Sequence, residues 1–168
     1  MKRILGAARS IDGDLQVQTT GDCPLIDAKI IDLVIDKFLD NDGKYDFVSN
    51  EIIRSFPIGL DCRVFPVDTL AKADKMCKDP IHRAHGSTYM YVGDSKDQFV
   101  SHNVIATGKL NQPNFRWTLD ESDDLEFIRA VVKNFINCVF DFSSSDLIDW
   151  LIQNPDVIDI NSSVKQKK

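Results

Sequence analysis

The chain has 168 residues, a formal net charge of −6 and 43% hydrophobic residues, which fits one globular domain. The charged fraction of 27% and the ten Phe exclude disorder over most of the chain. A pI near 5.0 argues against nucleic acid or an anionic membrane as partner, since either needs concentrated Lys and Arg. No apolar run approaches the roughly 18 residues of a membrane span, and the first residues lack a signal-peptide pattern, so we expect a cytoplasmic protein.

The cysteines show no metal-binding or disulfide pattern. They are widely spaced and form no C-x-x-C pair, which predicts scattered thiols, mostly small core residues. They are Cys23, Cys62, Cys77 and Cys138.

Helices and strands are predicted to alternate along the first two thirds of the chain. One helix is expected at 2–10. The next is expected to have Asp27 as N-cap, apolar residues at helical spacing from Ile30 to Leu39, and Asp42-Gly43 as stop. Further helices are expected at 68–78 and within 81–91. The strands are expected at 15–20, 45–50, 60–65 and 98–106.

The last third is predicted to contain one more strand and two helices. The strand is expected at 115–119, followed by a helix whose apolar stripe runs from Leu125 to Ile136 and by a helix over 143–152. The pattern predicts an α/β layered fold with a largely parallel sheet, as one domain over 1–160 with a polar tail over 161–168.

Two acidic residues follow predicted strands and are the first candidates for chemistry. Asp22 ends the first strand and Asp120 the last, and in an α/β sheet ligands bind beyond the carboxyl ends of the strands. Two carboxylates at one rim hold Mg²⁺ together with substrate phosphates, and Gly21 allows a ligand to approach the backbone closely. The alternative is that both Asp residues are turn or helix N-caps.

Other candidate sites carry weaker signals. Arg54 is suited to grip a carboxylate or phosphate, or is a surface charge beside the loop 57–59. His82 and His85 have the i, i+3 spacing of a metal pair, but no third ligand lies near in sequence, which disfavours zinc. The chain contains neither G-x-x-x-x-G-K-[ST] nor G-x-G-x-x-G.

Several motifs in order along the chain resemble the SpsF-like cytidylyltransferases of spore-coat polysaccharide synthesis, relatives of the acylneuraminate and 3-deoxy-manno-octulosonate cytidylyltransferases. The motifs are TGDCPLID (20–27), YDFVSN (45–50), RSFPIGLDCRVF (54–65), RAHGSTY (83–89) and RWTLD (116–120) with DDLE (123–126). Arg63 and Ala84 stand where the family pattern has Glu.

The resemblance implies a Rossmann-like nucleotidyltransferase fold with flanking helices. The reaction it implies is attack by a sugar or sugar-acid oxygen on the α-phosphate of CTP, which gives a CMP-sugar and pyrophosphate. By the same resemblance, Asp22 and Asp120 are the Mg²⁺-binding carboxylates, and Gly21, Arg54, Gly59 and Asp61 bind substrate. The family pattern also implies a homodimer with contacts in 54–91.

The family pattern places a loop of the type R-x-x-S-x-R-L-P-x-K before the first motif. This sequence starts close to its first motif, so we expect a C-terminal portion of a cytidylyltransferase that lacks the N-terminal nucleotide-binding part and is inactive alone. The alternative is a non-catalytic remnant that serves as a binding or dimerisation module.

Overall fold

The computed structural model describes residues 1–40, 43–135 and 142–166. The chain forms two compact units, and each unit is assembled from separate stretches of sequence. Unit 1 comprises residues 1–19, 31–53 and 62–104, and unit 2 comprises residues 20–30, 54–61 and 105–168. We describe each unit by itself.

Unit 1 contains a four-stranded mixed sheet. The strands are β1 (Leu15–Gln18), β2 (Phe47–Ser49), β3 (Arg63–Pro66) and β4 (Ser101–Asn103), in the spatial order β1-β3-β2-β4. β3 pairs antiparallel with both β1 and β2, in registers that place Val17 and Val48 opposite Val64, while β2 and β4 pair in parallel.

The prediction of a largely parallel sheet is therefore wrong. β2 is joined to β3 by residues 50–62, which contain no helix, and parallel neighbours usually need a helical crossover. The one helix between β1 and β2 does not make these strands neighbours, because β3 lies between them. The expected strand over 115–119 is also no part of this sheet, since its one bridge joins Arg116 to Ile58.

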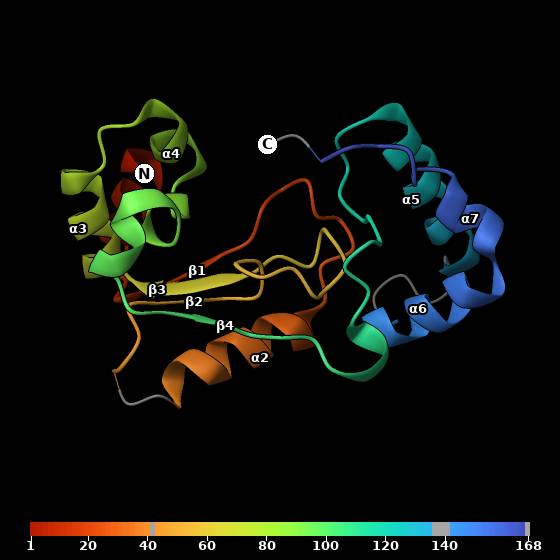
Figure 1. Ribbon diagram of the computed structural model, residues 1–168, viewed down its shortest axis with the longest axis horizontal. Coiled ribbons are helices and arrows are strands. Elements are labelled where there is room, and N and C mark those ends of the chain that lie inside the picture. Colours follow the sequence, from red (N-terminus) through yellow and green to blue (C-terminus); the bar gives the residue numbers. More distant parts are fainter. Residues whose placement is uncertain (41–42, 136–141, 167–168) are drawn as a thin grey trace. The chain divides into compact units, whose positions relative to one another are not determined.

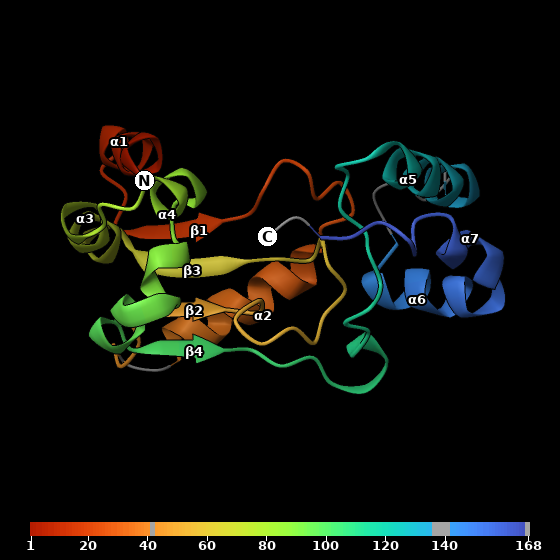
Figure 2. The same ribbon diagram turned by 45° about the horizontal axis from the view of Figure 1, so that its top comes forward.

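Helices cover both faces of the sheet in unit 1 (Figures 1 and 2). α1 (Lys2–Ser10), α3 (Val67–Met76) and α4 (Pro80–His85) lie over one face, and α2 (Ala28–Leu39), most of which belongs to unit 1, lies on the other. Two 3₁₀ turns, η1 (Thr88–Met90) and η2 (Gly93–Gln98), lead into β4. All four helices overlap ranges predicted to be helical, with ends that differ by a few residues, and α4 covers only the first part of the range 81–91.

The core of unit 1 is apolar on both faces of the sheet. Phe47 and Phe65 stack with ring centroids 5.8 Å apart in a cluster that includes Leu5 of α1 and Leu70 of α3. Neighbouring strand residues point to opposite faces, and Val48 and Val64 are also fully buried. Burial on both faces is what a sheet covered by helices on each side requires.

Unit 2 contains the remaining helices. They are α5 (Ser122–Phe135), α6 (Ser144–Gln153), α7 (Pro155–Asp159) and the 3₁₀ turn η3 (Gly108–Leu110). Phe127 and Val131 of α5 and Leu147 and Leu151 of α6 are buried, as the predicted stripes require; Ile136 lies outside the described residues. α6 contacts η3 and α7, and α5 contacts α7.

Asp27 serves the first turns of two helices. Its Oδ1 accepts the Lys29 N–H at 2.8 Å, at the start of α2, as predicted for an N-cap. Its Oδ2 accepts the Ser144 N–H at 2.7 Å, at the start of α6. α6 also has a capping box between Ser143 and Asp146.

The cysteines that the structure describes, Cys23, Cys62 and Cys77, are buried free thiols, as predicted, and Cys138 lies outside the described residues. In the described parts of the chain, no helix is both long and apolar enough to span a membrane.

Candidate active site

All six site residues predicted from the sequence lie in unit 2. They come from its three stretches of chain: Gly21 and Asp22 from the first, Arg54, Gly59 and Asp61 from the second, and Asp120 from the third.

The segment that carries Asp22 is bonded directly to the segment that carries Asp120. The Asp22 carbonyl oxygen accepts the Leu119 N–H at 2.8 Å and the Thr118 hydroxyl at 3.1 Å. The same hydroxyl lies 3.5 Å from Asp120 Oδ2. The expectation that these segments meet is confirmed, but not through neighbouring strands of the sheet, since β1 ends at Gln18 and residues 118–120 form no strand.

The RWTLD motif forms an extended segment with its polar side chains on one face. Arg116, Thr118 and Asp120 alternate with Trp117 and Leu119, and side chains two residues apart in an extended chain point the same way. Arg116 Nη2 donates to Asp120 Oδ2 at 2.7 Å. The side chain of Asp120 keeps 30% of its surface exposed, so its carboxylate is both held by Arg116 and open to solvent.

Asp124 is the buried centre of this cluster. It receives hydrogen bonds from Arg116 Nε at 2.8 Å and Nη2 at 2.9 Å, and from the N–H groups of Asp120 and Glu121 at 3.0 Å. Asn161 Nδ2 donates to it at 3.0 Å. Burial alone raises the pKa of this carboxyl, but the hydrogen bonds from Arg116, the backbone and Asn161 outweigh burial and lower its pKa to about 2. Asp124 is therefore a fixed anion that positions Arg116.

The loop over 54–61 is closed by an ion pair between its two ends. Arg54 binds both carboxylate oxygens of Asp61, and Nη2 lies 3.1 Å from Oδ2. Arg54 was predicted to bind a carboxylate or phosphate with two nitrogens, and in the structure that carboxylate is Asp61. Both side chains remain partly exposed.

Gly59 fixes this loop against the RWTLD segment. Ile58 exchanges backbone hydrogen bonds with Phe115 at 2.8 Å and Trp117 at 2.7 Å. Gly59 has a φ of +105°, and a Cβ there would lie 2.7 Å from the carbonyl carbon of Trp117. A side chain is excluded by the neighbouring backbone, so this glycine has a structural role.

Gly21 and Asp22 are exposed, and a Cβ built at Gly21 meets no described atom within 4 Å. Next to them, Cys23 is buried. Burial raises the pKa of its thiol to about 11, against the effect of a hydrogen bond with Thr20, and the nearby carboxylates of Asp22 and Asp61 raise it further. Cys23 is therefore protonated at neutral pH and is not a thiolate nucleophile.

Among the described residues, no group of three or more His, Cys, Asp or Glu side chains has the geometry of a metal site. The two residues predicted to bind a metal, Asp22 and Asp120, would together supply two carboxylates. Carboxylate oxygens are hard ligands that suit Mg²⁺, which commonly takes one or two of them and completes its shell with phosphates and water.

Sequence reasoning missed Arg116, Thr118, Asp124 and Asn161 as parts of this cluster. The alternation of polar and apolar residues over 116–120 was a signal for three side chains on one face. Asn161 gave no such signal, because its contacts with Arg116 and Asp124 join residues 45 and 37 positions apart. Asn161, assigned to the polar tail, is buried.

The chain was compared with known proteins, and one solved structure has a similar fold. No protein-family model matches the chain. A solved structure of a cytidylyltransferase from Leptospira borgpetersenii is similar over 99% of this chain and 66% of its own, with a TM-score of 0.86 and 32% identity. The fold is that of a cytidylyltransferase.

Two curated proteins are similar in sequence. The uncharacterized protein MJ1063 of Methanocaldococcus jannaschii is 30% identical over 99% of this chain, and the spore coat polysaccharide biosynthesis protein SpsF of Bacillus subtilis is 22% identical over 93%. The similarity to SpsF, together with the structural match, supports a cytidylyltransferase family for this chain.

The chain spans 65% of the length of the first relative and 62% of the second. These shares give no support to the expected loss of an N-terminal nucleotide-binding part, and CTP binding by this chain is proposed below.

Proposed function

We propose that this chain carries the magnesium-binding carboxylates of a nucleotidyltransferase that transfers CMP from CTP to an oxygen of a sugar or sugar acid. The observation that carries the proposal is the junction of two segments, where the Thr118 hydroxyl bonds the Asp22 carbonyl and lies 3.5 Å from the Asp120 carboxylate. Similarity to a cytidylyltransferase over 99% of the chain supports the choice of reaction.

In this reaction, the sugar oxygen forms a bond to the α-phosphorus of CTP, the bond to the pyrophosphate oxygen breaks, and the sugar hydroxyl loses its proton to solvent. Asp22 and Asp120 supply carboxylate oxygens that would hold Mg²⁺. When bound, the metal neutralises phosphate charge and orients the α-phosphate. Arg116, anchored by Asp124, keeps the Asp120 carboxylate in place. The open space at Gly21 allows a phosphate to approach the backbone.

The proposed sugar side of the site is the loop over 54–61. Arg54 and Asp61 neutralise each other and retain exposed edges, so they offer both donors and acceptors to hydroxyl groups. This pair therefore suits a polyhydroxylated acceptor. Homodimerisation through 54–91 is proposed from the family pattern, and sedimentation equilibrium of the purified chain tests it.

Nucleotide binding is the first test. Isothermal titration of the full chain with CTP and Mg²⁺ is expected to show binding that weakens at least about tenfold in Asp22→Asn, because a metal ligand is lost. Asp22 is exposed, so this variant should fold. Asp156→Asn, an exposed carboxylate on α7, is the matched control and should bind as the wild type does. Absence of CTP binding, or equal binding by Asp22→Asn, would contradict the proposal.

Turnover is the second test. Pyrophosphate release is measured with CTP, Mg²⁺ and a panel of sugars and sugar acids, and is expected to require both Asp22 and Asp120. If CTP neither binds nor raises the melting temperature, the alternative of a non-catalytic binding or dimerisation module is favoured.

A further inference from the structure

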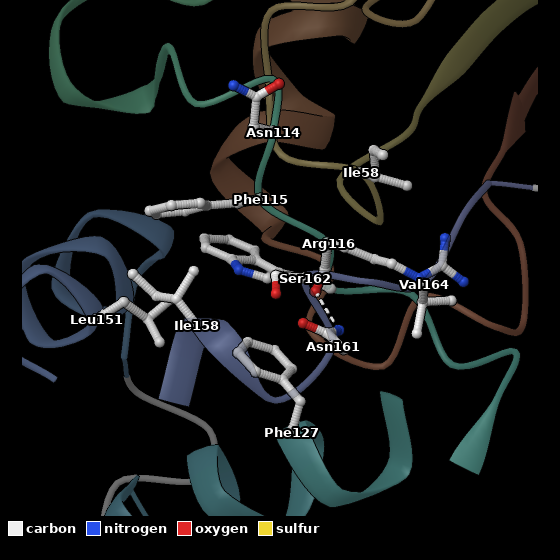
Figure 3. A pocket seen from close by; sticks show the side chains of 11 residues that line it. Ile58, Asn114, Phe115, Arg116, Phe127, Leu151, Ile158, Asn161, Ser162 and Val164 are labelled. Carbon is white, nitrogen blue, oxygen red and sulfur yellow. Dashed lines mark hydrogen bonds between the residues drawn. The ribbon is translucent and has the colours of Figure 1, made fainter. Parts of the chain in front are cut away.

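Residues 161–166, here called the tail segment, return to Arg116 of the RWTLD motif. Asn161 Nδ2 donates to the Arg116 carbonyl at 2.9 Å (Figure 3). Val164 lines the same pocket as Arg116, and its N–H donates to the Asn161 carbonyl at 3.1 Å. Beyond Val164, the hydrogen bond that joins the tail segment to the rest of the described chain comes from the Gln166 side chain, whose Oε1 accepts from Arg116 Nη1. The tail segment therefore contacts Arg116 at both of its ends.

The two terminal nitrogens of Arg116 have partners of different charge. Nη2 donates to the Asp120 and Asp124 carboxylates at 2.7 and 2.9 Å, and Nε donates to Asp124 as well. Nη1 donates to the Gln166 side chain, which is a neutral acceptor. Hydrogen bonds to Asp124 and Asp120 outweigh burial and raise the pKa of Arg116, so the guanidinium is charged at neutral pH. Among the described contacts of this guanidinium, the one at Nη1 therefore lacks an anion.

An anion suits Nη1 better than an amide oxygen does. Phosphate oxygens make shorter and stronger hydrogen bonds with a guanidinium than neutral acceptors make. Nη1 and Nη2 belong to one rigid, planar group, so Nη1 is held beside the Asp120 carboxylate that Nη2 binds. Asp120 is the proposed metal ligand, and its side chain keeps 30% of its surface exposed. Nη1 is therefore a cationic donor next to the place where the proposed function puts the phosphates.

Gln166 is placed to give way to such an anion. Gln166 is exposed, whereas the Arg116 side chain is only 5% exposed with Gln166 in place. Release of Gln166 costs one hydrogen bond and restores rotamer freedom to a long side chain. Asp120 and Asp124 bind the other nitrogens of Arg116 and keep their contacts. The exchange therefore uncovers Nη1 without disturbing the carboxylate cluster.

We propose that Arg116 Nη1 binds a phosphate oxygen of the substrate, and that Gln166 occupies the position of this oxygen before the substrate binds. This inference rests on the proposed function. It gives Arg116 a second role, because the residue that holds Asp120 also contacts the phosphate. It makes the tail segment a competitor of the substrate, so substitutions of Gln166 are expected to change affinity in opposite directions.

The competition is measured by isothermal titration of the full chain with CTP and Mg²⁺. Gln166→Glu places an anion on Nη1 that is harder to displace and repels phosphate, so binding is expected to weaken at least about threefold. Gln166→Ala removes the competitor, and binding should tighten at least about twofold. Gln153→Glu, at an exposed residue of α6, makes the same change in charge as Gln166→Glu and should bind as the wild type does.

Release of Gln166 is measured without the nucleotide. In a ¹⁵N-labelled sample, comparison with Gln166→Ala identifies the side-chain amide signals of Gln166. Titration with inorganic pyrophosphate and Mg²⁺ is expected to move these signals to the positions of an exposed glutamine, because Arg116 no longer donates to Oε1. Sodium chloride with Mg²⁺ is the control and should leave the signals unchanged. This readout needs neither CTP nor turnover.

The two measurements separate the inference from the proposed function. If CTP binds but pyrophosphate leaves the Gln166 signals in place, or Gln166→Glu binds CTP as tightly as Gln153→Glu, the inference is overturned and the proposed function stands. Weaker binding by Gln166→Ala also overturns the inference, since Gln166 would then assist the substrate. If pyrophosphate releases Gln166 but CTP does not bind, the phosphate contact is supported and the proposed CMP transfer is contradicted.

Discussion

Units 1 and 2 differ in their backbone pairing, because the described strands of the sheet all lie in unit 1. Unit 1 has a ladder of backbone hydrogen bonds between four strands and an apolar core on both faces of the sheet. In unit 2, polar side chains bind backbone groups between distant segments: Asp27 binds Ser144, Thr118 binds Asp22, and Asn161 binds Arg116. The candidate active-site residues belong to this second kind of structure. In unit 2, the same hydrogen bonds therefore position the candidate site residues and stabilise the fold.

The largest expected effect is that of Asp124→Ala. The change leaves the buried Arg116 charge without its main partner, and breaking a buried ion pair costs about 4 kcal/mol. Urea unfolding measures the loss. Asp123→Ala, at the exposed neighbour in the same helical turn, should change stability by less than about 0.5 kcal/mol. Similar losses for the two variants would show that unit 2 does not depend on this cluster.

Gly59→Ala is expected to have the next largest effect. The alanine Cβ would meet the Trp117 backbone, and φ is positive, so we expect a loss of about 3 kcal/mol. Gly21→Ala is the control, because nothing described lies within 4 Å of its Cβ and we expect a change below about 0.5 kcal/mol. Thermal unfolding of both variants tests this, and an unchanged Gly59→Ala would mean that the loop is not tied to segment 115–118.

The effects of Asp27→Ala and Asp79→Ala compare helix N-capping in the two units. Asp27→Ala removes the acceptor for two helix starts, so a loss of about 2 kcal/mol is expected from about 1 kcal/mol at each. Asp79 in unit 1 serves α4 alone, through the N–H groups of Ile81 and His82. Asp79→Ala should therefore cost about half as much. Equal losses by chemical unfolding would argue that the Asp27–Ser144 contact adds nothing.

The stability is also expected to depend on acid pH. The folded-state pKa of Asp124 is lowered from 3.8 to about 2, so its stabilising contribution is complete above pH 4 and is lost as the pH falls toward 2. The difference in urea midpoint between wild type and Asp124→Asn should narrow over this window. A difference that stays constant would show that Asp124 titrates alike in the folded and unfolded states.

Periodic patterns predicted much of this structure. Apolar spacing located the helices α1, α2 and α5, because burial on one face repeats at a fixed interval, and each of the four strands overlaps a predicted strand. The direction of the strands was not predictable in the same way. The relative direction of β2 and β3 depends on the path of the loop over 50–62, and residues 54–61 of that loop belong to unit 2.

The candidate site was predictable only in part. Asp22 and Asp120 were singled out because each follows a predicted strand, and their segments do meet. The Glu expected at position 63 is an Arg, which pairs in unit 1 with Glu51 and Ser87. Neither that pairing nor the one between Arg116 and Asp124 follows from local sequence, because each depends on side chains that the fold brings together.

The interleaving of the two units has a consequence during synthesis on the ribosome. All of unit 1 is available once residue 104 has emerged from the ribosome, so its sheet is free to form while later residues are still being made. Unit 2 cannot close until its third stretch emerges, since Asn161 and Ser144 supply contacts to Arg116 and Asp27. Until then, residues 20–30 and 54–61 of the nascent chain lack the contacts that the third stretch of unit 2 supplies. During this interval these two segments are the ones that a chaperone would bind to prevent misfolding.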